Sequence, residues 1–266
     1  MTSRSVDEGS NDSLVHRAWR EAESGAVPPS EKTSMNVARR IVRDIQRSGM
    51  SPGQSLPPEF EMLATFNVGR ASLREALRML EVQGLISIKP GPGGGPVVEE
   101  PTGINVGRLL SLQFNRVGAT YGDVVRARLL VDPPLARLAS AQRSQEELAD
   151  LRDIVDRARR IPVRNDAEWA RVVSTFNSVV AAMSGNAVQY MISGALRTIY
   201  VERITTIRYT ERMRALTIKR YDAIVDAIAS GDGDQAELAM HDLIEDSIKQ
   251  MTRHYPETLR ETVDWQ

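Results

Sequence analysis

The sequence contains no cysteine, few aromatic residues and almost no net charge. Without cysteine the chain can form neither disulfides nor thiolate metal sites, which is compatible with a reducing cytoplasm. Aromatic residues are 5% of the 266 residues, so the aliphatic side chains within its 41% hydrophobic content must build the cores. The 34 basic and 35 acidic residues give a formal net charge of −1, which argues against broad adhesion to nucleic acid or anionic membranes. Any contact with DNA must therefore be local.

Long apolar segments are also absent. No run approaches the roughly 18 consecutive apolar residues of a membrane span, and the start MTSRSVDE lacks the apolar centre of a signal peptide. We therefore expect a cytoplasmic protein without membrane contact. Residues 1–34 are rich in Ser, Asp, Glu and Pro. They hold too few apolar side chains to offset the entropy of ordering, which predicts a mobile N-terminal tail.

A helix-turn-helix pattern occupies residues 56–81. Helical spacing is interrupted once, at residues 67–69. The apolar residues that keep it are Phe60, Leu63, Ala64, Leu73, Ala76, Leu77 and Leu80. In the second helix, Arg70, Arg74 and Arg78 lie on a face beside the apolar stripe. A guanidinium can bind a phosphate or the O6/N7 edge of guanine, so this helix fits a recognition helix in the major groove. The alternative is a solvated arginine face on an ordinary surface helix.

A predicted hairpin follows directly. Residues 85–89 are a strand candidate, residues 90–96 form a loop of glycine and proline, and residues 97–98 can return as a second strand. With a helix from Thr33, this predicts a winged helix-turn-helix domain at residues 35–98. A phosphate-cradling glycine loop would open directly into a helix, so a wing tip near the DNA backbone is the better interpretation. The residues expected to contact DNA are Arg70, Ala71, Ser72, Arg74, Arg78, Lys89, Gly93 and Gly94.

These residues resemble the GntR family of bacterial transcription regulators. The matching positions are Leu56-Pro57, Glu59, Glu61, Val68, Arg70, Arg74-Glu75-Ala76-Leu77, Leu80-Glu81 and Gly84-Leu85. Two positions differ from the family pattern: Pro58 replaces a small N-cap residue, and Phe60 stands where many members carry a DNA-contacting arginine. The resemblance implies a homodimeric regulator whose two winged helices read a pseudo-palindromic operator in double-stranded DNA.

Beyond a linker at residues 99–103, the pattern changes to helix-length periodic segments with brief breaks. The predicted helices span residues 104–117, 122–142, 146–160, 166–183, 187–209, 211–229 and 234–253. Short connections favour antiparallel neighbours. The predicted fold is therefore mostly α: an N-terminal winged helix-turn-helix with a small β wing, then an all-α antiparallel bundle at residues 104–254. Residues 255–266 are expected to form a C-terminal tail.

This half resembles FCD, the ligand-sensing domain of the FadR-type branch of the GntR family. The segments that carry the resemblance are residues 128–139, 176–177, 183–186, 221–228 and 231–236. Many members of that branch hold a divalent metal, and the equivalent positions here are Val173, Asn177, Tyr221 and Leu243. Such side chains do not make a donor set for a transition metal, and the chain has only three histidines, all at other positions. We therefore expect no metal and no cofactor.

The FCD resemblance also implies an effector cavity. Arg128 matches an arginine that faces the cavity in relatives, while Asn177 and Tyr221 replace two ligand side chains. These three residues are the expected effector contacts, and the guanidinium favours an anion such as an organic acid or an acyl-coenzyme A. The alternative is a filled core in which Arg128 pairs with Asp132, four residues later.

No constellation of catalytic residues is found. Two other interpretations of the chain remain open. One is an enzyme or carrier that binds a nucleotide or acyl-coenzyme A through the glycine loop. The other is a DNA-binding dimer that has no effector.

Overall fold

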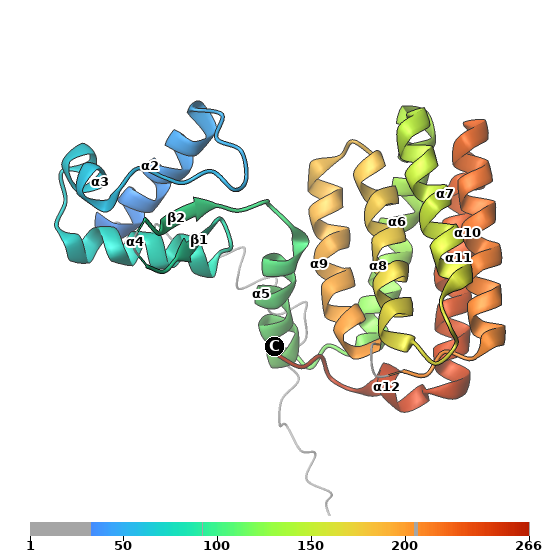
Figure 1. The fold of residues 1–266 in the computed structure, drawn as a ribbon. Coiled ribbons are helices and arrows are strands. Elements are labelled where there is room, and N and C mark those ends of the chain that lie inside the picture. The colour runs from blue at the N-terminus through green and yellow to red at the C-terminus, as the bar shows by residue number, and fades with distance from the viewer. Residues whose placement is uncertain (1–32, 92, 205–206, 266) are drawn as a thin grey trace, which may run out of the picture.

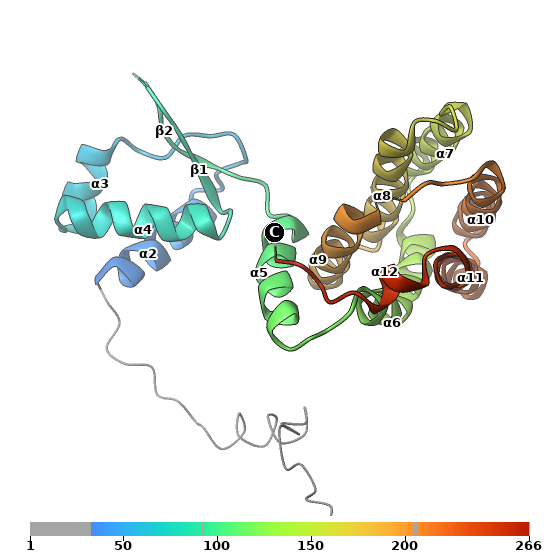
Figure 2. The same ribbon diagram turned by 90° about the horizontal axis from the view of Figure 1, so that it is seen from below.

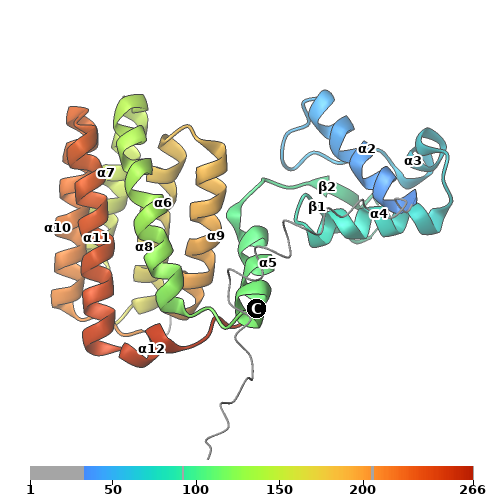
Figure 3. The same ribbon diagram turned by 180° about the vertical axis from the view of Figure 1, so that it is seen from behind.

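The structure is a computed structural model that describes residues 33–91, 93–204 and 207–265. Figure 1 shows a small N-terminal part and a larger helical part, with helix α5 (Gly103–Arg116) between them. Figures 2 and 3 show the same division from below and from behind. The mobile tail predicted for residues 1–34 lies outside the described residues, except for Thr33 and Ser34, which begin the first described helix.

The N-terminal part is a helix-turn-helix with a two-stranded wing. Its elements are α2 (Thr33–Arg47), α3 (Glu59–Phe66), α4 (Arg70–Val82), β1 (Ile86–Lys89) and β2 (Gly95–Val98). Helix α2 packs across α4. The two strands pair antiparallel, in a register that places Ile86 opposite Val98 and Lys89 opposite Gly95. The predicted winged-helix fold is confirmed.

The two helices of the helix-turn-helix differ in how well the sequence predicted their buried faces. In α4 the expected stripe is buried: Leu73, Ala76, Leu77 and Leu80. In α3 the sequence indicated only helical spacing, and the structure shows that Phe60 is 70% exposed while Met62 and Phe66 are buried. Phe60 and Ala64 lie on one stripe of this short helix, and Met62 and Phe66 lie roughly half a turn away. Met62 and Phe66 belong to the same buried cluster as Leu73 of α4, so the stripe that holds Phe60 faces outward.

The helical part contains α5 and six long antiparallel helices. These are α6 (Tyr121–Gln142), α7 (Gln145–Arg160), α8 (Asp166–Met183), α9 (Ala187–Ile204), α10 (Glu211–Ser230) and α11 (Gly233–His254). Their bounds match the predicted ones within one residue, except at the end of α9. That helix was expected to continue to residue 209, but the backbone N–H of Tyr209 donates to Asp166 at 3.1 Å, and Tyr209 therefore lies outside the helix. None of the described helices has both the length and the apolar composition that crossing a bilayer requires.

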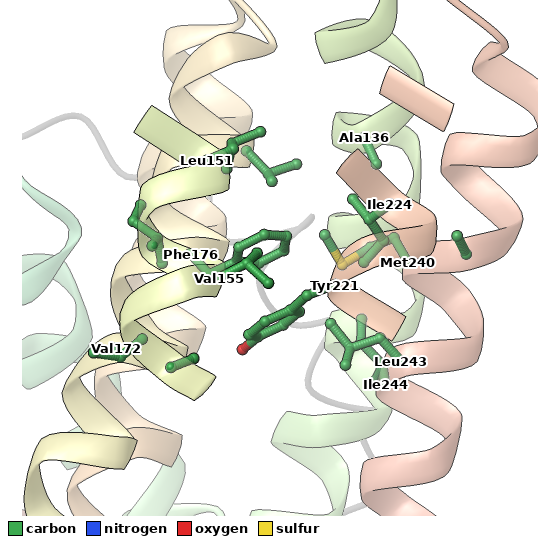
Figure 4. Close-up of a cluster of buried hydrophobic side chains, with 14 of the residues drawn as sticks. Ala136, Leu151, Val155, Val172, Phe176, Tyr221, Ile224, Met240, Leu243 and Ile244 are labelled. Carbon is green, nitrogen blue, oxygen red and sulfur yellow. The ribbon is translucent and has the colours of Figure 1, made fainter. Parts of the chain in front are cut away.

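Aliphatic residues from these helices fill the core, as the low aromatic content predicted. Figure 4 shows this cluster, in which the rings of Phe176 and Tyr221 stack with centroids 3.8 Å apart. The N-terminal part has its own separate core, to which Ile41, Leu73 and Ile86 belong. Two independent cores are consistent with two folding units.

The last residues are not the tail that the sequence predicted. Helix α12 (Pro256–Arg260) packs on α6 and α11, and Val263 is completely buried. The backbone carbonyl of Val263 accepts a hydrogen bond from the Asn115 side chain at 2.8 Å. Apolar residues spaced by four, Tyr255, Leu259 and Val263, carry this segment along the end of the bundle. Their burial offsets the entropy of ordering the segment.

Helix α6 begins at a reciprocal capping box. The Thr120 hydroxyl accepts a hydrogen bond from the Asp123 backbone N–H at 3.2 Å, and the Asp123 carboxylate accepts one from the Thr120 backbone N–H at 2.9 Å. Hydrogen bonds from the backbone and hydroxyl of Thr120, and then from Arg126, lower the pKa of Asp123 to about 2 from its ordinary value of 3.8. The carboxylate form is therefore favoured in the folded state.

Thr120→Ala is expected to lower the free energy of unfolding at pH 7 by about 1 kcal/mol, a typical loss for an N-cap. Because the folded pKa of Asp123 is depressed, its stabilising effect is present above about pH 4 and is lost as the pH falls towards 2. Urea unfolding at several pH values measures this, with Thr120→Ser as the matched control. A difference between Thr120→Ala and wild type that stays constant from pH 7 to pH 3 would contradict the assignment.

Candidate nucleic-acid interface and effector cavity

A groove in the N-terminal part lies between α4 and the wing. Its lining includes five of the residues expected at DNA, namely Ala71, Arg74, Arg78, Gly93 and Gly94. The structure therefore brings one face of the predicted recognition helix together with the tip of the hairpin. The glycine loop leads into strand β2 rather than a helix, which disfavours the phosphate-cradling interpretation.

Three other predicted DNA contacts lie outside the lining of this groove. Arg70 is exposed at the first position of α4, Ser72 is half-buried, and Lys89 is exposed at the end of β1. Both cations remain open to solvent. In the described part of the chain, no carboxylate forms an ion pair with Arg70, Arg74 or Lys89. These charges are available to an external polyanion.

The groove also carries acidic side chains, which limit its attraction for DNA of any sequence. Glu59, Glu75 and Glu81 lie among the lining residues. The carboxylate of Glu81 accepts a hydrogen bond from the Ile88 backbone N–H at 3.3 Å and so connects α4 to the wing. Such a mixed surface agrees with the near-zero net charge and favours local contacts over broad electrostatic adhesion.

The helical part contains a partly open cavity of about 70 Å³ between α6, α8, α9, α10 and α11. Arg128, Asn177 and Tyr221, the three residues expected to bind an effector, all line it. Val173 and Leu243 line it too, so the positions equivalent to the family's metal ligands do converge on one space.

Arg128 is already paired inside this cavity. Its Nε and Nη2 atoms both lie 2.8 Å from Oδ2 of Asp132, and both side chains are buried. The other carboxylate oxygen of Asp132 accepts a hydrogen bond from the Ser193 hydroxyl of α9 at 2.7 Å. The pairing that the sequence left as an alternative to a cavity is therefore present together with the cavity.

Four buried polar atoms on lining residues have no hydrogen-bond partner in the described structure. They are Trp169 Nε1, Asn177 Oδ1, Arg197 Nη1 and Tyr221 Oη. Figure 4 shows the Tyr221 hydroxyl pointing away from Ile224 and Met240. Burial raises the pKa of the Tyr221 phenol, so it stays protonated and can donate. Because an unpartnered buried polar group costs free energy, these atoms favour a ligand that pairs with them.

The residues present do not fit the metal site of the FCD branch. Val173 and Leu243 carry no donor atoms, Tyr221 keeps its proton, and the neutral Asn177 oxygen is the one ordinary ligand left. His241 and His254 lie outside the lining, and His16 lies outside the described residues. Across the part of the chain that the structure describes, no group of three or more His, Asp and Glu side chains could hold an ion. The metal-free effector site stays a prediction.

Sequence reasoning missed several polar residues that line the cavity, among them Trp169, Arg197 and Arg220. Arg220 lies at the cavity edge, paired with Asp242 at 2.7 Å and Asp246 at 2.8 Å. Arg197 is 8% exposed and sits within the apolar run of α9 that includes Leu196 and Tyr200. A lone arginine among buried apolar neighbours is a sequence signal that could have identified it.

Comparison with known proteins agrees with this arrangement. A family model described as bacterial regulatory proteins, gntR family, matches residues 33–94, and the FCD domain model matches residues 123–246. The HTH-type transcriptional repressor NanR of Escherichia coli K12 is 28% identical over 222 residues, covering 79% of this chain and 81% of NanR. The HTH-type transcriptional regulator Mce2R of Mycobacterium tuberculosis is 29% identical over 227 residues, covering 83% of this chain and 92% of Mce2R.

A solved structure, Streptococcus agalactiae GntR, has the same fold. It superposes with a TM-score of 0.66 at 22% identity and covers 82% of this chain and 99% of its own. The overlap includes both the wing-bearing part and the helical part, since the shared length exceeds either of them.

Proposed function

We propose a mode of action for this chain from its family. It belongs to the GntR family of bacterial regulatory proteins and carries an FCD domain, so it is a transcription regulator and not an enzyme. It binds operator DNA as a homodimer, and a small anionic effector in the helical cavity controls that binding without a metal ion. The observation that carries the DNA-binding part is the groove that joins Arg74 and Arg78 of α4 to the wing tip. We infer that α4 enters the major groove and that the wing lies along the phosphate backbone.

The arginines and Lys89 are assigned different roles in this interface. Arg74 lies one turn into α4, where a side chain can reach base edges and donate two hydrogen bonds to a guanine. Lys89 ends strand β1 at the wing and offers a single flexible charge to a phosphate. The first contact gives sequence preference, and the second gives affinity that depends on salt.

Arg74→Ala is expected to weaken operator binding by about 1–3 kcal/mol and to relax base preference, while Lys89→Ala weakens all sequences and lowers the slope of log K against log salt by about 1. Fluorescence anisotropy with the full chain, on an operator selected from genomic fragments, measures both effects. Arg152→Ala, at an exposed position of α7 in the helical part, is the control and should change nothing. Unchanged operator affinity of Arg74→Ala at fixed salt would refute this placement of α4.

The size of the cavity favours a small effector. Its volume of about 70 Å³ is less than half of the roughly 150 Å³ of an engineered cavity that binds benzene. A short organic acid therefore fits with little rearrangement, whereas the acyl chain of an acyl-coenzyme A would require the helices to separate. Of the two effector classes that the sequence suggested, we propose the small acid.

We propose that α5 forms the dimer interface. It packs mainly on α9, and four of its large apolar side chains are 38–62% exposed: Ile104, Val106, Leu109 and Leu112. Figure 1 shows this helix at the side of the bundle. An exposed apolar face of this kind is typical of an interaction surface, and a second copy of the same face would bury it around a two-fold axis.

The same helix offers a route from the cavity to the DNA-binding part. A Cβ atom on Gly103 would lie 2.4 Å from the backbone nitrogen of Ala195, so α5 and α9 touch backbone to backbone there. Two residues later, the Asn105 side chain occupies the space beside Gly84, which precedes the wing. We propose that effector binding moves α9 against α5 and changes the separation of the two winged helices.

A further inference from the structure

Three arginines line the cavity, and two of them have carboxylate partners. Arg128 pairs with Asp132, and Arg220 pairs with Asp242 and Asp246. Arg197 forms no ion pair and no hydrogen bond with any residue that the structure describes, and its Nη1 atom is buried without a partner. The side chain is 8% exposed, so contact with bulk solvent contributes little to stabilising its charge.

Arg197 remains a cation despite its burial. Loss of solvent, and then the positive charge of Arg128, lower the pKa of its guanidinium to about 10, which still leaves it protonated at neutral pH. Asp132 attracts it, but the oxygens of Asp132 already bind Arg128 and Ser193. The group of Arg128, Asp132 and Arg197 therefore carries one uncompensated positive charge inside the protein.

We propose that Arg197 holds the negatively charged group of the effector, whereas Arg128 keeps Asp132 and Ser193 in place between α6 and α9. This inference rests on the proposed effector function of the cavity and assigns the anion to a residue that the sequence did not suggest. A carboxylate beside Arg197 would restore charge balance and supply the missing hydrogen bonds.

The other unpartnered atoms indicate what the rest of the ligand carries. The Asn177 amide donates to the carbonyl of Val173 at 2.8 Å, which leaves its oxygen as a free acceptor. Trp169 Nε1 is a free donor, and the Tyr221 hydroxyl can donate or accept. A ligand hydroxyl can donate to Asn177 and accept from Trp169 or Tyr221. These groups therefore complement a hydroxy acid rather than a purely hydrocarbon acid.

The cavity volume sets the length of that acid. At roughly 10–15 Å³ for each water-sized probe position, 70 Å³ holds about five to seven non-hydrogen atoms. Lactate and glycerate, which have three carbons, fall in this range. The structure therefore assigns the site to a short hydroxycarboxylate.

The test is calorimetric titration of the full chain with lactate, glycerate and acetate, and with lactamide as the uncharged analogue. Wild type should bind lactate or glycerate more tightly than acetate, and lactamide should not bind. In Arg197→Gln, affinity for the acid should fall by about 10-fold to 100-fold, the range for a lost hydrogen bond to a charged group. Arg197→Lys, which keeps the charge, should recover part of the affinity.

The double variant Arg128→Gln/Asp132→Asn removes the buried pair and keeps the Ser193 hydrogen bond possible. It should bind the acid within about threefold of wild type, a change of well under 1 kcal/mol. The melting temperature of ligand-free Arg197→Gln should equal or exceed that of wild type, because an unpaired buried charge has been removed. A merely structural Arg197 would instead give a lower melting temperature.

Binding of the acid by Arg197→Gln as tight as in wild type overturns the assignment, whether or not the double variant folds, and leaves the effector function in place. If the acid binds Arg197→Gln but not the double variant, Arg128 rather than Arg197 binds the negatively charged group. If wild type binds none of the acids at millimolar concentration, the effector part of the proposed function fails and this inference fails with it. The DNA-binding part of the proposed function would be unaffected by this result, because the operator affinity of Arg74→Ala tests it independently.

Discussion

Arg128→Ala is expected to destabilise the helical part by about 3–5 kcal/mol, the usual cost of removing one partner of a buried ion pair. Asp132 would be left at 3% exposure without its guanidinium partner, and the Ser193 hydroxyl would be its remaining hydrogen-bond partner at that end of the cavity. An unfilled volume would be added to the existing cavity, which raises the cost further. Few single substitutions in a domain of this size have so large an effect.

Tryptophan fluorescence during urea unfolding can measure this loss in the helical part alone. Trp169 is buried in the wall of the cavity, and no tryptophan lies within residues 33–98. A background with Trp19→Phe and Trp265→Phe therefore reports on the core that contains Trp169. This matters because two cores do not guarantee a two-state transition for the whole chain.

Two matched variants separate charge burial from general damage. Arg137→Ala removes an arginine that pairs with Asp234 and Glu237 on the surface, and such a pair should contribute less than about 1 kcal/mol. Arg128→Gln/Asp132→Asn should be less destabilised than Arg128→Ala, because it does not leave a buried Asp132 carboxylate without its guanidinium partner. An Arg128→Ala variant as stable as Arg137→Ala would show that the pair is solvated in solution.

The helices of this chain were predictable because their signals are local. The second helix of the helix-turn-helix repeats its apolar residues every three or four positions, and its stripe of Leu73, Ala76, Leu77 and Leu80 is buried as predicted. In the helical part, short polar breaks with good caps, such as Ser144 before α7, end each periodic segment. Periodicity and caps require no knowledge of what packs against the helix.

The errors arose where the outcome depends on distant contacts. Helical spacing alone also did not indicate which stripe of α3 is buried, and the structure buries Met62 while Phe60 stays exposed. Val263 is buried because its segment returns to the start of α6, where Thr262 bridges Thr120. The four-residue spacing of Tyr255, Leu259 and Val263 does not show where in the fold the segment packs.

Prediction of the candidate site from sequence was limited in the same way, by contacts between distant residues. Resemblance alone indicated Arg128, Asn177 and Tyr221, and the structure brings these residues together. Which arginine is free to bind an anion depends on Asp132 and Ser193, which lie on different helices. Sequence could show that Arg128 and Asp132 are one turn apart, but it could not show that Arg197 is left without a partner.

Residues 1–100, which lack the helical part, are expected to bind operator about 100-fold more weakly than the full chain, or worse. This fragment retains the complete N-terminal core, including Ile41, Leu73 and Ile86, and should fold. It lacks α5, which carries the apolar face that we assign to the dimer. A single winged helix offers one small base-reading surface, and the second binding event becomes intramolecular only when two such surfaces are joined.

Two further proteins test whether joining two winged helices is what raises the affinity. Fusing residues 1–100 to a parallel leucine zipper should recover most of the affinity, because a zipper supplies only the connection. In the full chain, Leu109→Glu should place a charge on the exposed face of α5 and shift the protein to monomers in sedimentation, with a similar loss of operator affinity. Wild-type affinity from a fragment that sediments as a monomer would mean that one winged helix is sufficient. If the Leu109→Glu variant remains dimeric, the dimer interface does not lie on this face of α5.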